Sequence, residues 1–296
     1  MTGSKNSLQA AFGVAAAAAV TVVQQTAQKP SYFKYLKQAA PLNLGAGVVC
    51  EVWEIDVPND EACLSEWASR FRQNYCPDSE IDVLRDGTGL SRAQYLTQLV
   101  FPDDKVNPGP GVRSGDFAEL LICDFVEFMH DYWVPRGKYA EKGARNESVK
   151  GVDIVGFKCP DADQPKPTDE MLTFEAKAQL SGGKYSGRLQ VAVDDSGKDY
   201  LRAAGTLAAM KRRMHLAGQQ DSMKVVQRFQ NAVDRPYRLL SGAAAILSDA
   251  AFDADGIKAT SVDAHNNKGN LKLIAVKGKD LMTLAHALYQ RAANEA

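Results

Sequence analysis

Three charged side chains near the middle of the chain have types and spacing that suit phosphodiester cleavage. Residues 172–177 read LTFEAK, so Glu175 and Lys177 lie two apart in an apolar run, and residues 151–155 read GVDIV, with Asp153 near the start of a second one. Side chains alternate between the faces of a strand, so Glu175 and Lys177 share one face while their neighbours point into a core. If the two strands pair, two carboxylates and an ammonium meet at one edge of a sheet.

Metal-assisted hydrolysis of a phosphodiester would use each of these groups. Carboxylate oxygens hold Mg²⁺ well, and this ion binds through only one or two protein carboxylates while keeping several waters. Asp153 and Glu175 are the expected ligands, with the carbonyl of Ala176 as a third, and Mn²⁺ is an alternative ion. Lys177 would orient or deprotonate the attacking water, or stabilise the charge of the phosphorane. Glu119, on a predicted helix before the sheet, could reach the same metal.

An acid and a lysine two residues apart are, by themselves, most often part of a solvated face. Three observations favour a site instead. The strand of Glu175 is apolar on its other face, which indicates a half-buried position. Asp153 precedes Glu175 by the length of a strand, a loop and part of a neighbouring strand. A helix carrying Glu119 comes before both.

Hydrophobic periodicity predicts the elements that must position these groups. Before the site we expect a strand at residues 48–57, helices at 60–74, 91–100 and 114–132, and a loop rich in proline and glycine at 101–111. From there on we expect an edge strand within 138–150, strands at 152–157, 171–178, 189–193, 257–262 and 271–276, and helices at 198–216, 222–249 and from 280. This order indicates the α/β (α+β) class, with a mixed central sheet flanked by helices.

Composition limits the class of protein. The chain has 296 residues, of which 45% are hydrophobic, enough for one large domain or two small ones. Five cysteines without a C-x-x-C pair disfavour a disulfide framework and a zinc site, and favour a reducing cytoplasm. The alanine-rich run at residues 10–23 is too short for a membrane span, and we expect a buried helix or strand there rather than a cleaved signal peptide. No membrane association and no small-molecule cofactor are expected.

Charge is distributed unevenly. The net charge is −1, but residues 50–90 carry ten acidic and three basic side chains, whereas residues 177–213 carry eight basic and three acidic ones. The loop rich in proline and glycine lies between these two charge patterns. It predicts an acidic N-terminal α/β extension domain at residues 1–105 and a domain with the candidate site at residues 106–296. The acidic region could dock a basic partner, mimic DNA and block a basic groove, or simply solvate the surface.

Four basic residues flank the candidate site and could contact the phosphates of DNA, or could be ordinary solvated charges. They are Arg145, Lys150, Lys184 and Arg188. The four histidines show no metal-binding spacing, and the two Gly-Lys pairs lack the pattern of a P-loop, so a histidine-metal nuclease and a P-loop site are disfavoured.

Longer motifs resemble the HamA family, the nuclease component of the Hachiman anti-phage system within the PD-(D/E)xK nuclease superfamily. They are residues 113–121 (RSGDFAELL), Lys142, Arg145-Asn146, residues 150–157 (KGVDIVGF) and residues 174–177 (FEAK). The helix at residues 64–75 and the pair Tyr95-Leu96 also look like that family, so the resemblance covers about residues 61–179.

This resemblance implies a restriction-endonuclease-like core and a Mg²⁺-dependent deoxyribonuclease. Asp153 and Glu175 would take the metal-ligand positions, Lys177 that of the catalytic lysine, and Glu119 that of the acid on the first helix. Val152 stands where the superfamily's name has proline. The family works with HamB, a helicase that restrains the nuclease until DNA damage or invading DNA is sensed, so DNA and a HamB-like helicase are the implied partners. The alternative is a non-catalytic, nuclease-fold binding or regulatory subunit of a nucleic-acid-processing complex.

Overall fold

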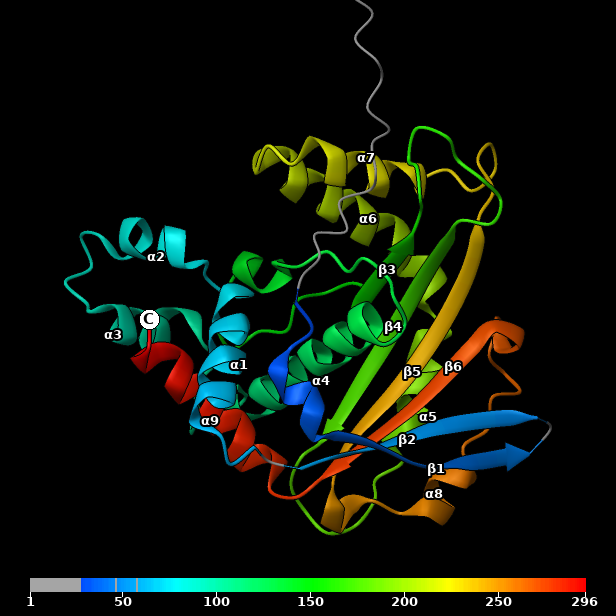
Figure 1. Ribbon diagram of the computed structural model, residues 1–296, viewed down its shortest axis with the longest axis horizontal. Helices are drawn as coiled ribbons and strands as arrows, with labels where there is room; N and C mark the ends of the chain where they lie inside the picture. Colours follow the sequence, from blue (N-terminus) through cyan, green and yellow to red (C-terminus); the bar gives the residue numbers. More distant parts are fainter. Residues whose placement is uncertain (1–27, 46, 57) are drawn as a thin grey trace, which may run out of the picture.

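A six-stranded sheet in the order β1-β2-β6-β5-β4-β3 forms the centre of the molecule (Figure 1). The computed structural model describes residues 28–45, 47–56 and 58–296. The strands are β1 (Leu36–Gly45), β2 (Val48–Ile55), β3 (Ile154–Lys158), β4 (Glu170–Gln179), β5 (Arg238–Ser248) and β6 (Leu271–Gly278). β2, β6, β5 and β4 are parallel, and the edge strands β1 and β3 pair antiparallel with their neighbours. The predicted mixed sheet is confirmed.

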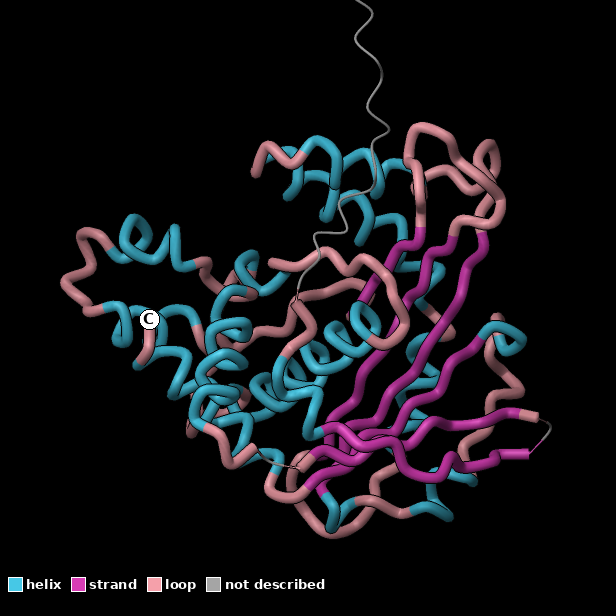
Figure 2. The backbone as a smooth tube through the Cα atoms, viewed as in Figure 1, coloured by secondary structure: helices cyan, strands magenta, loops and turns pink. Residues whose placement is uncertain are grey.

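Helices cover both faces of the sheet, as Figure 2 shows in outline. They are α1 (Glu61–Gln73), α2 (Asp78–Arg85), α3 (Arg92–Tyr95), α4 (Gly109–Phe128), α5 (Arg188–Ser196), α6 (Asp199–Leu216), α7 (Gln220–Arg228), α8 (Ala254–Lys258) and α9 (Leu281–Asn294). α1, α4 and α9 pack on one face, whereas α5 to α8 pack on the other. The predicted flanking of the sheet by helices is therefore confirmed.

Alternation along the strands decides which face each side chain joins. Phe174 and Ala176 of β4 lie in the core under α4, whereas Ala243 and Ala245 of the neighbouring β5 lie in the core under α5. Glycine is required at Gly242, because a Cβ there would lie 2.1 Å from the ring of Phe174. Since the odd-numbered residues of β4 face away from Phe174, the α5 and α6 side receives the charged pair of this strand.

Most predicted elements form close to their expected bounds. Residues 48–57 correspond to β2 and residues 60–74 to α1, where the Asp60 side chain accepts a hydrogen bond from the backbone N–H of Cys63. The helix expected from Ser114 begins earlier, at Gly109, because Pro110 is compatible with the first helical turn. Both strands of the candidate site, the last strand and the last helix correspond to β3, β4, β6 and α9.

Two predictions about periodicity are wrong. Residues 189–193 belong to helix α5 and not to a strand, because Leu189, Ala192 and Val193 recur at helical spacing and pack against the sheet. Residues 222–249 are not one helix but α7 followed by β5. Alanine favours helices, yet burial between helices on both faces of a parallel sheet overrides this preference.

Two predicted strands are also wrong. Residues 257–262 overlap the end of α8, whose start is fixed by the Asp253 side chain accepting from the backbone N–H groups of Asp255 and Gly256. Residues 138–150 contain a short 3₁₀ helix, Lys138–Glu141, and no strand. This correction matters for the site, because the 3₁₀ helix brings two functional groups to it.

The predicted border at residue 105 does not divide the sheet. β2, from the N-terminal segment, pairs in parallel with β6 near the C-terminus. The largest core likewise joins Trp53 and Trp67 to Phe117 and Ala244. The border therefore marks the loop before α4, and both predicted segments contribute to one sheet and one core.

Other predictions from composition concern the cysteines and the N-terminal run. All five cysteines are free and buried. The alanine-rich run at residues 10–23 lies outside the described residues. Within the described part of the chain, no helix combines the length and the apolar character needed to cross a membrane.

Candidate active site

The segment before β3 brings Asp153 to the edge of β4. β3 and β4 pair antiparallel only as far as Ile154 opposite Phe174, and beyond this point no strand in the described part of the chain pairs with that edge of β4. The Asp153 carboxylate takes that place and accepts a hydrogen bond from the backbone N–H of Ala176 at 3.1 Å. The two segments that the sequence predicted to be neighbours are therefore in direct contact.

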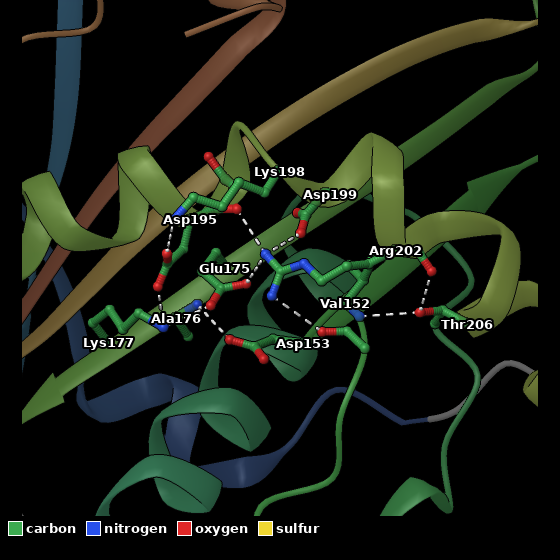
Figure 3. A network of polar contacts seen from close by, with 12 residues as sticks. Val152, Asp153, Glu175, Ala176, Lys177, Asp195, Lys198, Asp199, Arg202 and Thr206 are labelled. Carbon is green, nitrogen blue, oxygen red and sulfur yellow. Dashed lines mark hydrogen bonds and ion pairs between the residues drawn. The ribbon is translucent and has the colours of Figure 1, made fainter. Parts of the chain in front are cut away.

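Glu175 and Lys177 form a close pair on the face of β4 covered by α5 and α6 (Figure 3). The Lys177 Nζ atom lies 2.6 Å from Glu175 Oε1, and the Glu175 side chain is only 3% exposed. Burial acts to lower the pKa of Lys177, but its hydrogen bonds to Glu175 and Asp195 and the charges of Glu175 and Asp153 outweigh burial, so this pKa lies above its ordinary value. Lys177 is therefore an ammonium at neutral pH.

Glu119 reaches the same region from α4, on the other side of the sheet edge. Its carboxylate accepts a 2.7 Å hydrogen bond from the Tyr139 hydroxyl and forms an ion pair with Lys138. Lys138 also donates to the backbone carbonyl of Asp153 at 2.7 Å. The 3₁₀ helix thus links Glu119 to the segment of Asp153.

The electrostatic environment of Asp153 favours a cation. Burial raises the pKa of Asp153 well above its ordinary value, and the negative charge of Glu119 raises it further, whereas Lys138 opposes this shift. Two carboxylates that disfavour each other's charge would be relieved by a bound divalent ion. The donors are all oxygen atoms, which suits Mg²⁺ or Mn²⁺.

A cleft of about 640 Å³ opens beside these groups. Glu119, Asp153 and Lys177 line it, together with Arg188, His286 and small residues of α4 such as Gly111 and Gly115. Among the described residues, no group of three or more His, Cys, Asp or Glu side chains is close enough to enclose a metal ion by itself. That observation is compatible with Mg²⁺, which takes one or two carboxylates and completes its shell with water and substrate oxygens.

The four predicted phosphate contacts occupy different positions. Arg188 lines the cleft, and its Nε is buried without a hydrogen-bond partner among the described residues. Lys150 and Lys184 are exposed, and in the sequence they lie close to Asp153 and Lys177 respectively. Arg145 instead donates to the backbone carbonyl of Thr97 at 2.7 Å, in the helical segment Leu96–Val100, and pairs with Asp103 at 2.6 Å, so its guanidinium ties its own loop to this segment and to the loop after it.

Several residues that contact the site were missed by sequence reasoning. Lys138 and Tyr139 stood in a predicted edge strand, and Asp195 and Arg202 looked like solvated charges, although Asp195 lies 3.0 Å from Lys177 Nζ and Arg202 lies 3.3 Å from Glu175 Oε2. Asp195 and Arg202 lie on two different helices, α5 and α6, so no helical spacing in the sequence linked them. His286, interpreted as structural or surface, lines the cleft.

Acidic residues of the 50–90 region are mostly paired within the structure. Their partners come from several other elements, and the pairs include Asp56 with Lys37, Asp60 with Lys34, Asp78 with Arg72, Asp82 with Arg85 and Arg92, Glu54 with Lys277, and Glu61 with Arg291. This local compensation reduces the negative charge available for docking a basic partner or for mimicking DNA.

A mixed sheet flanked by helices, with an acid and a lysine on one strand and a second acid at its open edge, is consistent with a nuclease-like α/β fold. The HamA family model matches residues 30–292, and the chain belongs to the HamA family. Membership of this family implies an association with Hachiman anti-phage defence. Searches of curated proteins and of solved structures gave no match.

Proposed function

We propose that this protein is a metal-dependent DNA endonuclease of the Hachiman defence system, held in check by a HamB-like helicase. One observation carries the proposal: Asp153 contacts the backbone of the strand that bears the Glu175–Lys177 pair, at the edge of an open cleft. Membership of the HamA family supports the defence context.

The carboxylates of Asp153 and Glu175, with Glu119 nearby, are the groups that would hold Mg²⁺ or Mn²⁺. When bound there, the ion would polarise a phosphate oxygen and lower the pKa of an attacking water. Lys177 carries its proton at neutral pH, so we assign it the stabilisation of negative charge on the phosphate rather than proton abstraction. The hydrogen bond from the N–H of Ala176 fixes the direction of the Asp153 carboxylate.

The chain alone offers few basic groups at the cleft for binding DNA. Its net charge is −1, and Arg188 is the predicted phosphate contact that lines the cleft. Because non-specific DNA affinity comes mainly from many Lys and Arg contacts to phosphates, a partner that delivers the DNA is the simplest complement. A HamB-like helicase, implied by the resemblance to the HamA family, would fill this role.

Plasmid cleavage tests the proposal. Purified protein, alone and with its helicase partner, is incubated with supercoiled plasmid and Mg²⁺, and nicked and linear products are measured. We expect cleavage by the wild type and its loss in Glu175→Ala and Lys177→Ala. Glu170→Ala is the matched control, because Glu170 lies on the same strand at the opposite end and pairs with Arg238.

Equal cleavage by both site variants and the wild type would contradict the assignment of the site. If neither wild type nor variants cleave, with or without the helicase, the protein would be better described as a non-catalytic subunit on a nuclease fold. Retained defence activity in the variants would support that alternative.

A further inference from the structure

We propose that Asp195, at the end of α5, is a positioning residue for the Lys177 ammonium; this inference rests on the proposed nuclease function. Lys177 Nζ lies between two carboxylates, 2.6 Å from Glu175 Oε1 and 3.0 Å from Asp195 Oδ2 (Figure 3). Asp195 does not line the cleft, whereas Lys177 does. The lysine is thus held from behind by a carboxylate that is not itself a candidate metal ligand.

The need for a second carboxylate follows from the double role assigned to Glu175. When the Glu175 carboxylate binds a cation, its attraction for the Lys177 ammonium becomes weaker, and the cation also repels the ammonium. Asp195 then remains as the anionic partner that keeps Lys177 beside the reacting phosphate. Charge-assisted hydrogen bonds of this kind are short and directional, which is what positioning requires.

Asp195 is itself held in place by the corner between α5 and α6. Its backbone carbonyl accepts a 2.6 Å hydrogen bond from Arg202, and its side chain pairs with Lys198 at 2.8 Å. The same Arg202 guanidinium contacts Glu175 Oε2 at 3.3 Å and Asp199 Oδ1 at 2.7 Å. One arginine therefore connects the support of Lys177 to the other half of the Glu175–Lys177 pair (Figure 3).

The neighbouring Asp194 offers a matched control. It is on the same helix and exposed, and its side chain accepts from Gln190 at 2.8 Å, with no contact to Lys177 among the described residues. Asp195→Asn and Asp194→Asn remove the same charge from adjacent positions. Any difference between them reports the contact with Lys177 and not the net charge of α5.

The experiment measures the availability of Lys177 directly, without metal or DNA. Wild type, Asp195→Asn, Asp195→Glu and Asp194→Asn are treated briefly with acetic anhydride, and acetylation of Lys177 is quantified by mass spectrometry against that of Lys211. We expect acetylation of Lys177 to be about threefold faster in Asp195→Asn than in the wild type. In Asp194→Asn and in Asp195→Glu, which keeps the carboxylate, we expect the wild-type rate. In the plasmid assay, cleavage should fall about tenfold in Asp195→Asn alone.

The outcomes separate this inference from the proposed function. An unchanged acetylation rate in Asp195→Asn would overturn the positioning role, whatever the cleavage result. Faster acetylation with undiminished cleavage would overturn it as well, because the position of Lys177 would then not matter to the reaction. If the wild type cleaves no DNA, the proposed function fails, and the acetylation rates still decide whether Asp195 holds Lys177.

Discussion

Helix α4 contributes a carboxylate to each of two charged clusters, one that is open to the cleft and one that is enclosed. The cleft cluster comprises Glu119, Asp153, Glu175 and Lys177, and three of its members line the cleft. The closed cluster comprises Tyr75, Asp116, Lys142 and Tyr289: Asp116 accepts from Tyr75 at 2.5 Å and pairs with Lys142, and their side chains are 3% and 4% exposed. Both contain a carboxylate and an ammonium in contact.

The difference between the clusters is what surrounds the ion pair. In the closed cluster, Tyr75 and Tyr289 share a 2.5 Å hydrogen bond and complete an enclosed network between α1, α4 and α9. In the cleft cluster, Asp153 and Lys177 are accessible from an opening of about 640 Å³. An ion pair sealed by hydroxyl groups supports the fold, whereas one facing a cleft can exchange partners with a substrate. The comparison predicts opposite consequences of mutation in the two places.

The largest expected effect is the loss of cleavage in the cleft cluster. Asp153→Asn keeps the acceptor for the Ala176 N–H but removes the charge, so plasmid cleavage should fall at least about a thousandfold. Because the raised pKa of Asp153 means that its ionised form is disfavoured by folding, the free energy of unfolding should stay constant or rise by about 1 kcal/mol. Urea unfolding at pH 7 measures this; a loss of more than about 2 kcal/mol would place Asp153 with the structural groups.

The closed cluster should show the reverse. Lys142→Met leaves the buried Asp116 without its cation, and we expect the free energy of unfolding to fall by about 3 kcal/mol at pH 8. The double variant Lys142→Met/Asp116→Asn should recover part of that loss, since no buried charge remains. A single variant as stable as the wild type would show that this pair contributes little.

The loss of stability in Lys142→Met should depend on pH in a defined direction. Burial raises the pKa of Asp116 to about 6. An acid whose pKa is raised by folding contributes stability that is complete below its unfolded pKa of about 4 and is lost as pH rises through the folded value. Without Lys142 the pKa of Asp116 rises further, so the difference from wild type should be largest at pH 8 and smaller at pH 5. Unfolding at both pH values measures it; a constant difference would exclude Asp116 as its cause.

The smallest expected effects distinguish two arginines that the sequence predicted as phosphate contacts. Arg188→Ala should weaken DNA binding severalfold and reduce its dependence on salt, without loss of stability. Arg145→Ala should instead lower the free energy of unfolding by about 1–2 kcal/mol, because it removes the hydrogen bonds to Thr97 and Asp103. Salt-dependent binding and urea unfolding of both variants provide the measurement, and an exchange of these two results would reverse the assignment.

The core of the candidate site could be predicted because it depends on local rules. Strand alternation put Glu175 and Lys177 on one face, and the spacing to Asp153 suggested adjacent strands. Asp195 and Arg202 could not be predicted in the same way, because their approach depends on how α5 and α6 pack on the sheet. Residues 189–193 fit both the alternation of a strand and the spacing of a helix, and the packing of this segment against β4 and β5 is that of helix α5.

The fold shows the same limit. Alanine-rich β5 was hidden by the helix preference of its residues, and its place between β4 and β6 is set by parallel pairing with strands distant in sequence. Likewise, the local sequence of residues 138–141 does not predict that Lys138 links Glu119 to the segment of Asp153. Long-range pairing decided each of these cases.

The most direct test of the central claim, that the cleft cluster holds a catalytic cation, is Mn²⁺ binding measured by electron paramagnetic resonance of the purified protein. We expect the wild type and Glu170→Gln to bind Mn²⁺ alike, and Asp153→Asn/Glu175→Gln to bind it at least about tenfold more weakly. Equal Mn²⁺ affinity in all three proteins would contradict the claim.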